Sequence, residues 1–179
     1  MTLLDIKKKT LQLIEEISDN EDLTNDPDIK AKLNSVINQV QFELARMKKI
    51  PAVKEEEVTD TQVFDMNTLE NFYQLRLLRF PGAYEIVENM VVFNGDGKAV
   101  FYYYKYPEAI TDETPDDYVF ELAPDALEIL PYGVASDLLK SDVSTEYGAV
   151  YSQRYETMLQ RLDPRFNMGS ITIEGGIDV

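Results

Sequence analysis

Residues 25–49 read NDPDIKAKLNSVINQVQFELARMKK, and this stretch predicts the clearest helix in the chain. Asp26 followed by Pro27 is typical of a helix start, because aspartate caps free backbone N–H groups and proline is tolerated in the first turn. The stretch ends just before Pro51, which cannot continue a helix. Apolar side chains recur every three or four residues in between and are expected to form one buried stripe: Ile29, Leu33, Val36, Ile37, Val40, Leu44 and Met47.

The residues before this stretch predict a second helix. Thr2 and Asp5 approximate a capping box, in which each residue bonds the backbone of the other. Apolar side chains follow at helical spacing as far as Ile17, and the polar cluster over 18–25 then interrupts the pattern. Residues 1–50 are therefore expected to form a helical hairpin.

The chain changes to a β pattern after Pro51. Tyrosine, phenylalanine and valine become dense, and the apolar period falls towards two. Asn94–Gly97, which reads NGDG, predicts a hairpin turn because these residues tolerate positive φ. Strands are expected near 53–58, 62–65, 73–79, 84–93, 99–106 and 118–122.

Helical spacing returns after Pro124 and predicts a pair of helices that ends near Leu162. Pro131 is expected to break or kink the first helix of the pair, because proline cannot donate the backbone hydrogen bond of a helix interior. The predicted helices near 27–48 and 143–162 are expected to pack together. The last residues contain three glycines and few apolar side chains, which predicts a flexible or extended tail.

These elements predict an α+β fold, in which a helical bundle carries an inserted antiparallel β unit and an extended C-terminal tail. Neither helical block has enough apolar residues for a full core of its own, so the two blocks are expected to share one. The predicted division is a helical bundle from 1–50 and 124–162, a β unit over 51–123 and a tail over 163–179.

The composition of the 179 residues excludes several classes of function. The chain has no histidine and no cysteine, which excludes a Cys/His zinc site, a thiol nucleophile and a Ser-His-Asp triad. The net charge is −16, and residues 51–123 alone carry 15 acidic and 5 basic side chains. Such a chain lacks the basic face that binds nucleic acid. No stretch approaches 18 apolar residues, and the start does not read as a secretory signal, so no membrane contact is expected.

Two kinds of motif remain for chemistry or binding. Consecutive carboxylates at 55–57, 112–113 and 116–117 offer a possible glycosidase pair, although such runs are usually solvated. The run 101–106 reads FYYYKY, so a strand here is aromatic on both faces and is either sandwiched or at an interface. One face carries a possible subunit contact, formed by Tyr102, Tyr104 and Tyr106.

The order of elements resembles the head–tail connector proteins of tailed bacteriophages, also called adaptor or head-completion proteins. The likeness rests on the helix over 25–49, on the stretch YYYKYPEAITDETPDDYVFELAPDALEILPYGVASDLL at 102–139, and on the last helix, which ends at Arg161-Leu162. It covers most of residues 1–162. The family shares a layout and a hydrophobic pattern, and the likeness assigns no catalytic, cofactor-binding or metal-binding residue.

The resemblance implies a structural protein of the virion neck, made in the host cytoplasm. Such proteins form a ring beneath the portal protein, twelve-fold by resemblance, and receive a tail-side neck or tail-terminator protein. The genomic DNA passes through the ring without specific binding, and an acidic lining would repel its phosphates. No cofactor is implied.

The tail supplies the second candidate interface, with the portal or a neighbouring subunit. Residues 171–173 alternate apolar β-branched residues, a pattern that suits addition as a strand to the edge of another sheet. The candidate contact residues are Phe166, Met168, Ile171, Ile173 and Ile177. Two other functions stay open at this point. The second is a protein- or glycan-binding module without catalysis, and the third is a carboxylate-dependent hydrolase.

Overall fold

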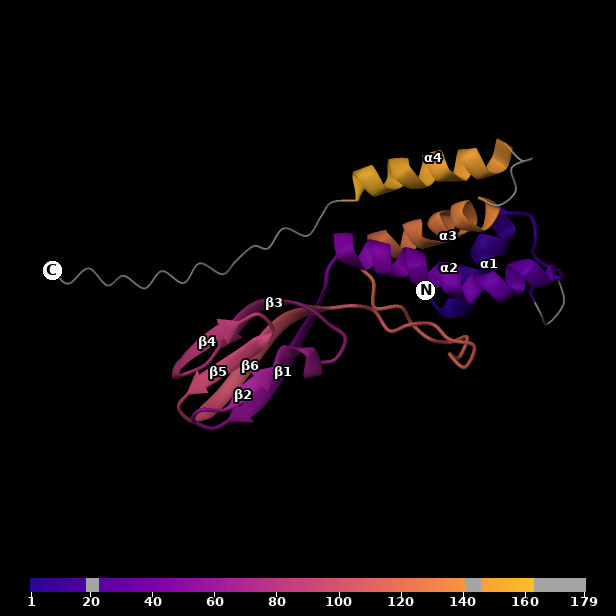
Figure 1. Ribbon diagram of the computed structural model, residues 1–179. Coiled ribbons are helices and arrows are strands. Elements are labelled where there is room, and N and C mark those ends of the chain that lie inside the picture. Colours follow the sequence, from indigo (N-terminus) through magenta and orange to yellow (C-terminus); the bar gives the residue numbers. More distant parts are fainter. Residues whose placement is uncertain (19–22, 141–145, 163–179) are drawn as a thin grey trace.

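The computed structural model describes residues 1–18, 23–140 and 146–162, and it has the expected α+β fold. Figure 1 shows a helical unit with a β unit at one of its ends. The elements are α1 (Leu3–Leu13), α2 (Pro27–Met47), β1 (Ile50–Val58), β2 (Val63–Asp65), a 3₁₀ turn (Met66–Thr68), β3 (Phe72–Arg79), β4 (Ala83–Val87), β5 (Met90–Asn94), β6 (Gly97–Lys105), α3 (Pro124–Leu139) and α4 (Glu146–Arg161).

Both predicted helix starts are confirmed. Thr2 and Asp5 bond each other's backbone N–H groups, at 3.2 and 2.9 Å, and so form the capping box of α1. The Asp26 carboxylate accepts from the N–H groups of Asp28 and Ile29, with Pro27 in the first turn of α2. The predicted stripe is largely buried against α3, and its fully buried members are Leu33, Ile37, Val40 and Leu44.

The central helix of the helical unit is α3, which packs against α1, α2 and α4. The expectation that α2 and α4 pack directly on each other is therefore wrong in its main part, because α3 takes the place between them. A direct contact between these two helices is the hydrogen bond that the Tyr155 hydroxyl donates to the Glu43 carboxylate at 2.8 Å. Gly133 of α3 makes this packing close, since a Cβ there would lie 2.6 Å from Val40 Cγ1.

Of the two predicted effects of Pro131, a break or a kink, the break is absent, because α3 continues as one helix through this residue. Proline has no N–H group, so the backbone carbonyl of Leu127 loses its usual hydrogen bond within the helix. Most of the side chains of α3 near Pro131 are, however, buried. Burial of apolar surface offsets one lost hydrogen bond, because each fully buried aliphatic side chain contributes about 1.5–3 kcal/mol.

The β unit consists of two three-stranded antiparallel sheets, with strand orders β1-β6-β3 and β2-β5-β4. The sheets pack face to face around phenylalanine rings from both. Phe64 of β2 stacks on Phe101 of β6 at 4.7 Å between centroids, and Phe93 of β5 meets the same ring edge-on at 6.4 Å. The core of the unit is completed by Val58, Met66, Leu69, Leu78, Val91, Ala99 and Tyr103.

Two predictions about this unit are wrong. The turn at Asn94–Gly97 is not a hairpin, because β5 and β6 belong to different sheets and the turn carries the chain from one sheet to the other. Gly95 and Gly97 do have positive φ, at 122° and 154°. The turn therefore has the backbone conformation that its residues favour, but it connects two sheets and not two paired strands. The predicted strand 84–93 is two strands, paired through a turn in which Glu88 has φ of 56°.

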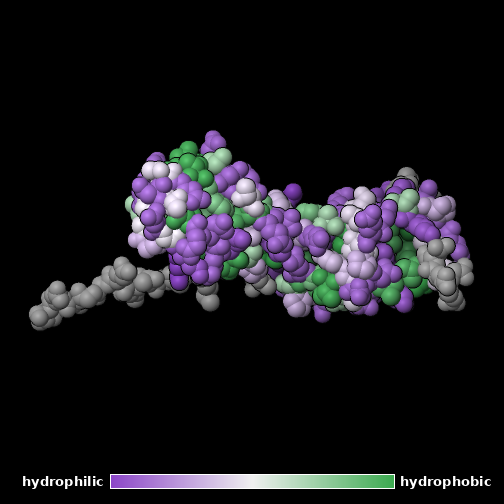
Figure 2. All heavy atoms as spheres, turned by 90° about the horizontal axis from the view of Figure 1, so that it is seen from below, coloured by the Kyte–Doolittle hydropathy of each residue, from purple (hydrophilic) through white to green (hydrophobic). Residues whose placement is uncertain are grey.

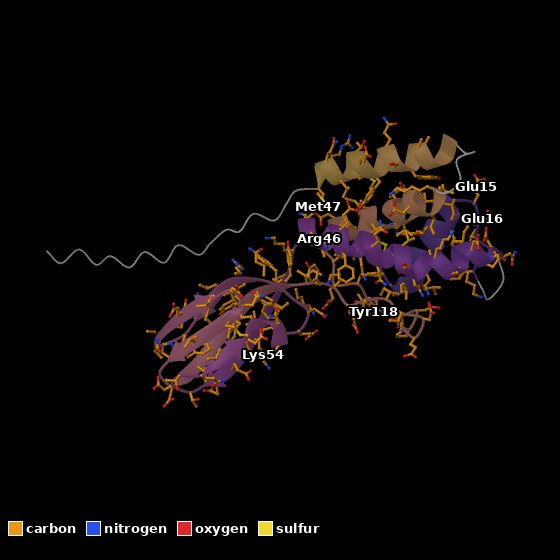
Figure 3. The ribbon with its side chains drawn as sticks, in the orientation of Figure 1. Glu15, Glu16, Arg46, Met47, Lys54 and Tyr118 are labelled. Atoms are coloured by element: carbon orange, nitrogen blue, oxygen red, sulfur yellow. The ribbon has the colours of Figure 1, made fainter. Side chains whose placement is uncertain are left out.

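The segment over 106–123 belongs with the helices, which moves the expected boundary of the β unit from residue 123 to about Lys105. Its buried side chains Ile110, Phe120 and Leu122 join the helical core. The expected strand at 118–122 is reduced to one isolated bridge, from Val119 to Thr2. Figure 3 labels Tyr118, which lies on this segment beside the helical unit.

Figure 2 shows hydrophobic side chains at the surface of both units, between larger hydrophilic areas. In the described part of the chain, no helix has both the length and the apolar character needed to span a bilayer.

Candidate functional site

The strand β4 differs from the other strands of the β unit because all five of its residues are exposed. It lies at an edge of the β2-β5-β4 sheet and, among the described residues, pairs with β5 alone. Tyr84, Ile86 and Val87 are 39, 42 and 53% exposed. We call Ala83–Val87 the edge strand. Exposed apolar edges are positions where proteins add a strand from another chain, and most proteins protect them with charge or proline.

A second apolar surface crosses the outer face of the β1-β6-β3 sheet. Tyr102 lies at its centre and pairs with Val53 on one side and Leu77 on the other. Val53 is 59% exposed and Leu77 is 40% exposed, while the Arg79 guanidinium lies 5.4 Å from the centroid of the Tyr102 ring. This row of three side chains is a small contact surface with one cation at its margin.

The three predicted tyrosines share a face but not a role. Tyr104 is only 6% exposed, and the Lys49 ammonium lies 5.0 Å from its ring centroid. Tyr106 lies between Tyr73 and Phe42, with ring centroids 4.7 and 5.6 Å away. Because Phe42 belongs to α2, these rings join the β unit to the helical unit. Of the three, Tyr102 is partly exposed and lies beside the exposed side chains of Val53 and Leu77, and its role in a subunit contact stays a prediction.

The acidic surface is concentrated in the segment over 106–123, which carries six acidic and no basic side chains, all six exposed. We call it the acidic segment. Asn38 fixes its backbone, since its side chain exchanges two 2.7 Å hydrogen bonds with Ile110. Leu3 N–H donates to the Tyr118 carbonyl at 2.9 Å, and Lys7 pairs with Asp116 at 3.1 Å. The carboxylates are therefore held on a fixed frame: Glu108, Asp112, Glu113, Asp116, Asp117 and Glu121.

Two lysines with largely buried side chains form ion pairs near the junction of the helical unit and the β unit. Lys105 lies 2.6 Å from Glu121 and 3.4 Å from Glu70. Burial lowers the pKa of Lys105, but its hydrogen bond to Glu121 and the two negative charges outweigh burial and leave the pKa raised. Lys48 pairs with Asp125 at 2.8 Å, and this contact outweighs burial and lowers the pKa of the Asp125 carboxyl. Lys105 therefore stays charged, and both ion pairs lie at the junction of the two units.

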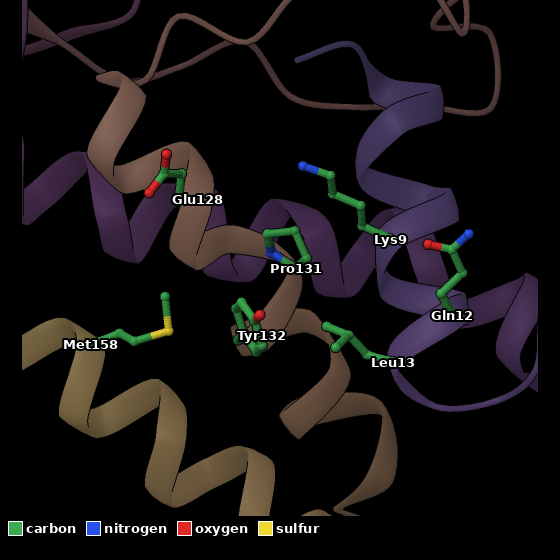
Figure 4. Close-up of a pocket in the computed structure, with 7 residues that line it drawn as sticks. All are labelled: Lys9, Gln12, Leu13, Glu128, Pro131, Tyr132 and Met158. Atoms are coloured by element: carbon green, nitrogen blue, oxygen red, sulfur yellow. The ribbon is translucent and has the colours of Figure 1, made fainter.

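A cleft of about 510 Å³ lies where α1, α3 and α4 diverge (Figure 4). Pro131 and Tyr132 form its floor on α3, with Lys9 and Glu128 from two different helices at its sides. The Arg154 guanidinium lies 4.4 Å from the Tyr132 ring centroid and covers that ring. The lining mixes apolar and charged groups without a cluster of one kind, which is typical of a surface cleft between helices.

Several of the carboxylates considered as a glycosidase pair are engaged in local contacts. Glu55 pairs with Lys98 at 2.5 Å, Glu56 with Lys54 at 3.6 Å, and Asp112 accepts from Asn34 at 2.9 Å. Over the described residues, no three acidic side chains are placed to hold a metal ion together. The predicted tail contacts Phe166, Met168, Ile171, Ile173 and Ile177 all lie outside the described residues.

Sequence reasoning missed the edge strand as a site. The signal was the pair Glu88-Asn89, which divides the apolar run 84–93 into two strands and leaves the first at the sheet edge. No protein-family model matches the chain, and no curated protein matches it either.

Proposed function

We propose that this chain is a structural assembly protein that forms a ring beneath the portal of a tailed phage and connects head to tail. The single observation that carries the proposal is the edge strand, an exposed apolar sheet edge suited to contact with a neighbouring subunit. The order of elements, which resembles head–tail connectors, supplies the context for that contact.

The acidic segment supports a role as a DNA conduit. Its six carboxylates are exposed and fixed to the helical unit through Asn38 and Leu3. A negative surface repels the phosphate backbone, so duplex DNA passes such a lining without adhering to it. On this proposal the partners are further copies of the chain, the portal protein and a tail-side neck protein, and the ring needs no cofactor.

Sedimentation velocity tests the proposal, with the chain alone and with the portal protein encoded by the same genome. The wild-type chain is expected to form a large complex, and Ile86→Asp is expected to weaken it by placing a charge in the edge strand. Ser35→Asp adds the same carboxylate to an exposed position of α2 and is the matched control. A chain that stays monomeric under both conditions would contradict the proposal.

A second function is favoured by the row Val53, Tyr102 and Leu77, which fits a protein- or glycan-binding module without catalysis. Substitution of Tyr102 by alanine distinguishes the two functions. It should leave portal binding intact if the edge strand carries assembly, and abolish partner binding if the tyrosine row is the functional surface.

A further inference from the structure

The inner layer of the β2-β5-β4 sheet is incomplete at the edge strand. Tyr84 pairs with Phe93 and Ile86 pairs with Val91, so all four side chains point to the same face. Phe93 and Val91 have no exposed surface, whereas Tyr84 and Ile86 are 39 and 42% exposed. One more strand beside β4 would supply neighbours for these two side chains.

A second copy of the edge strand does not fit this position. The register that pairs all five residues of two antiparallel edge strands places Glu85 directly opposite Glu85 of the other copy. Like charges in directly opposed positions destabilise a strand pair. The occupant therefore needs an uncharged residue at its centre and apolar residues on both sides of it.

Residues 163–179 lie outside the described part of the chain, and their sequence contains such a segment. Residues 170–174 read SITIE, five residues without proline, matching the five residues of the edge strand. Centred on Glu85, this segment places Thr172 opposite the carboxylate. In either strand direction Ile171 and Ile173 then lie beside Tyr84 and Ile86, on the inner face.

The length of the connection decides whether the edge strand of the same chain is within reach of the tail. Leu162 lines one cleft with Asp125, which bonds Lys48 close to the start of β1 at Ile50. The tail thus leaves the helical unit near the proximal end of the β unit. The edge strand lies distally, since Ala83 pairs with Asn94, just before β6 begins.

The two lengths can be compared. The nine residues of β6 span about 26 Å from the distal to the proximal end of the unit. Ser170 follows Leu162 by eight residues, a reach of about 26–29 Å only when fully extended. In the antiparallel direction Ser170 lies opposite Val87, about 13 Å closer to the proximal end than Ala83, so the edge strand of the same chain is also within reach and the assignment to a neighbouring copy rests on the proposed ring.

We propose that residues 170–174 of one copy add beside β4 of the next copy as a fourth strand of the β2-β5-β4 sheet, with Ile171 and Ile173 covering Tyr84 and Ile86. The inference rests on the proposed ring and names the contact that closes it from subunit to subunit. Each copy donates one tail and receives one, so the contact is head-to-tail and continues around the ring.

Disulfide cross-linking tests this pairing directly, because the natural chain contains no cysteine. One protein carries Glu85→Cys and the other Thr172→Cys. Directly opposed residues in a strand pair have Cα atoms about 4.5–5.5 Å apart, within the range that a disulfide spans. Mixing the two under mild oxidation is expected to give a covalent dimer on a non-reducing gel.

The matched control combines Thr172→Cys with Glu57→Cys, an exposed residue on β1 of the other sheet. The Glu85 pair should cross-link on the order of tenfold faster than the control pair, because docking raises the local thiol concentration. Adding Ile86→Asp to the Glu85→Cys protein should remove that advantage. Equal rates for the two pairs would overturn the inference.

A single chain with both Glu85→Cys and Thr172→Cys separates the two possible donors. Docking between copies gives covalent oligomers from this protein, whereas docking within one chain gives a cross-linked monomer at every dilution and would overturn the assignment to a second copy. Rings that form on the portal without the Glu85–Thr172 cross-link would refute this pairing and leave the proposed function standing.

Discussion

Gly133 provides a test of the helix packing, because alanine at this position has two opposed effects. Alanine stabilises a helix by about 0.5–1 kcal/mol relative to glycine when nothing obstructs its methyl group. Here the added Cβ would lie 2.6 Å from Val40 Cγ1, and 2.7 and 2.9 Å from two atoms of the Tyr155 ring. These distances are too short for unstrained contact, so α2 or α4 must move.

The packing effect is expected to win. Overpacking a core position typically costs about 1–3 kcal/mol, and the Tyr155 ring is held by its hydrogen bond to Glu43 at 2.8 Å. Subtracting the gain in helix propensity leaves a net loss of about 1–2 kcal/mol for Gly133→Ala. For a chain of this size that loss lowers the Tm by about 2–8 °C.

Thermal and urea unfolding of the two proteins measure this difference. Tyr155→Leu removes the ring, so Gly133→Ala should cost less in that background, and a double-mutant cycle gives the coupling between α3 and α4. A variant that is more stable than the natural protein would show that Gly133 faces open space and that α3 is not the central helix.

Three further predictions follow from single positions and from charge. Leu33→Ala should lower the free energy of unfolding by about 2–5 kcal/mol because Leu33 is buried. Lys32→Ala, on the exposed face of the same helix, should be nearly neutral. Equal unfolding midpoints of the two variants in urea would contradict the buried stripe. Burial and the hydrogen bond to Glu43 raise the pKa of Tyr155, so its contribution to stability is present below the unfolded pKa of about 10 and is lost as the pH rises above it. Tyr155→Phe should reduce that alkaline loss in unfolding curves, and an unchanged slope would refute the assignment. The chain should not retain linear duplex DNA on a filter at low salt, and salt-sensitive retention would contradict the conduit.

The helices could be predicted because their signals are local. The Thr2–Asp5 capping box, the Asp26-Pro27 start and the stripe through Leu33 each depend on residues within a few positions of one another. Such contacts are determined by the 3.6-residue period alone. Even so, the central place of α3 was missed, because periodicity identifies the apolar face of a helix but not the helix that it meets.

The strand pairing could not be predicted in the same way. A period of two identifies which side chains share a face, but the partner of each strand depends on contacts far apart in sequence. The NGDG turn has the backbone that its residues favour, yet Phe93 and Phe101 on either side of it belong to opposite sheets. The acidic segment looked like part of the β unit because its anchors, Ile110 and Phe120, are isolated among carboxylates.

The candidate site was predicted in part. The alternation of 101–106 correctly placed Tyr102 away from Phe101, and burial then separated Tyr102 from Tyr104. The edge strand became visible only with the order of strands in the β2-β5-β4 sheet. An edge is a property of the whole sheet, so the pair Glu88-Asn89 indicates two strands within 84–93 but not which of them lies at the edge.

The central claim is that the chain closes a ring on a portal. The most direct measurement is the mass of the complex that forms when the chain is mixed with portal rings from the same genome, determined by native mass spectrometry. We expect one closed ring of copies on each portal, twelve by the resemblance, with few partly filled portals because neighbouring copies bind one another. Portals that stay bare, or that take up single copies independently, would contradict it.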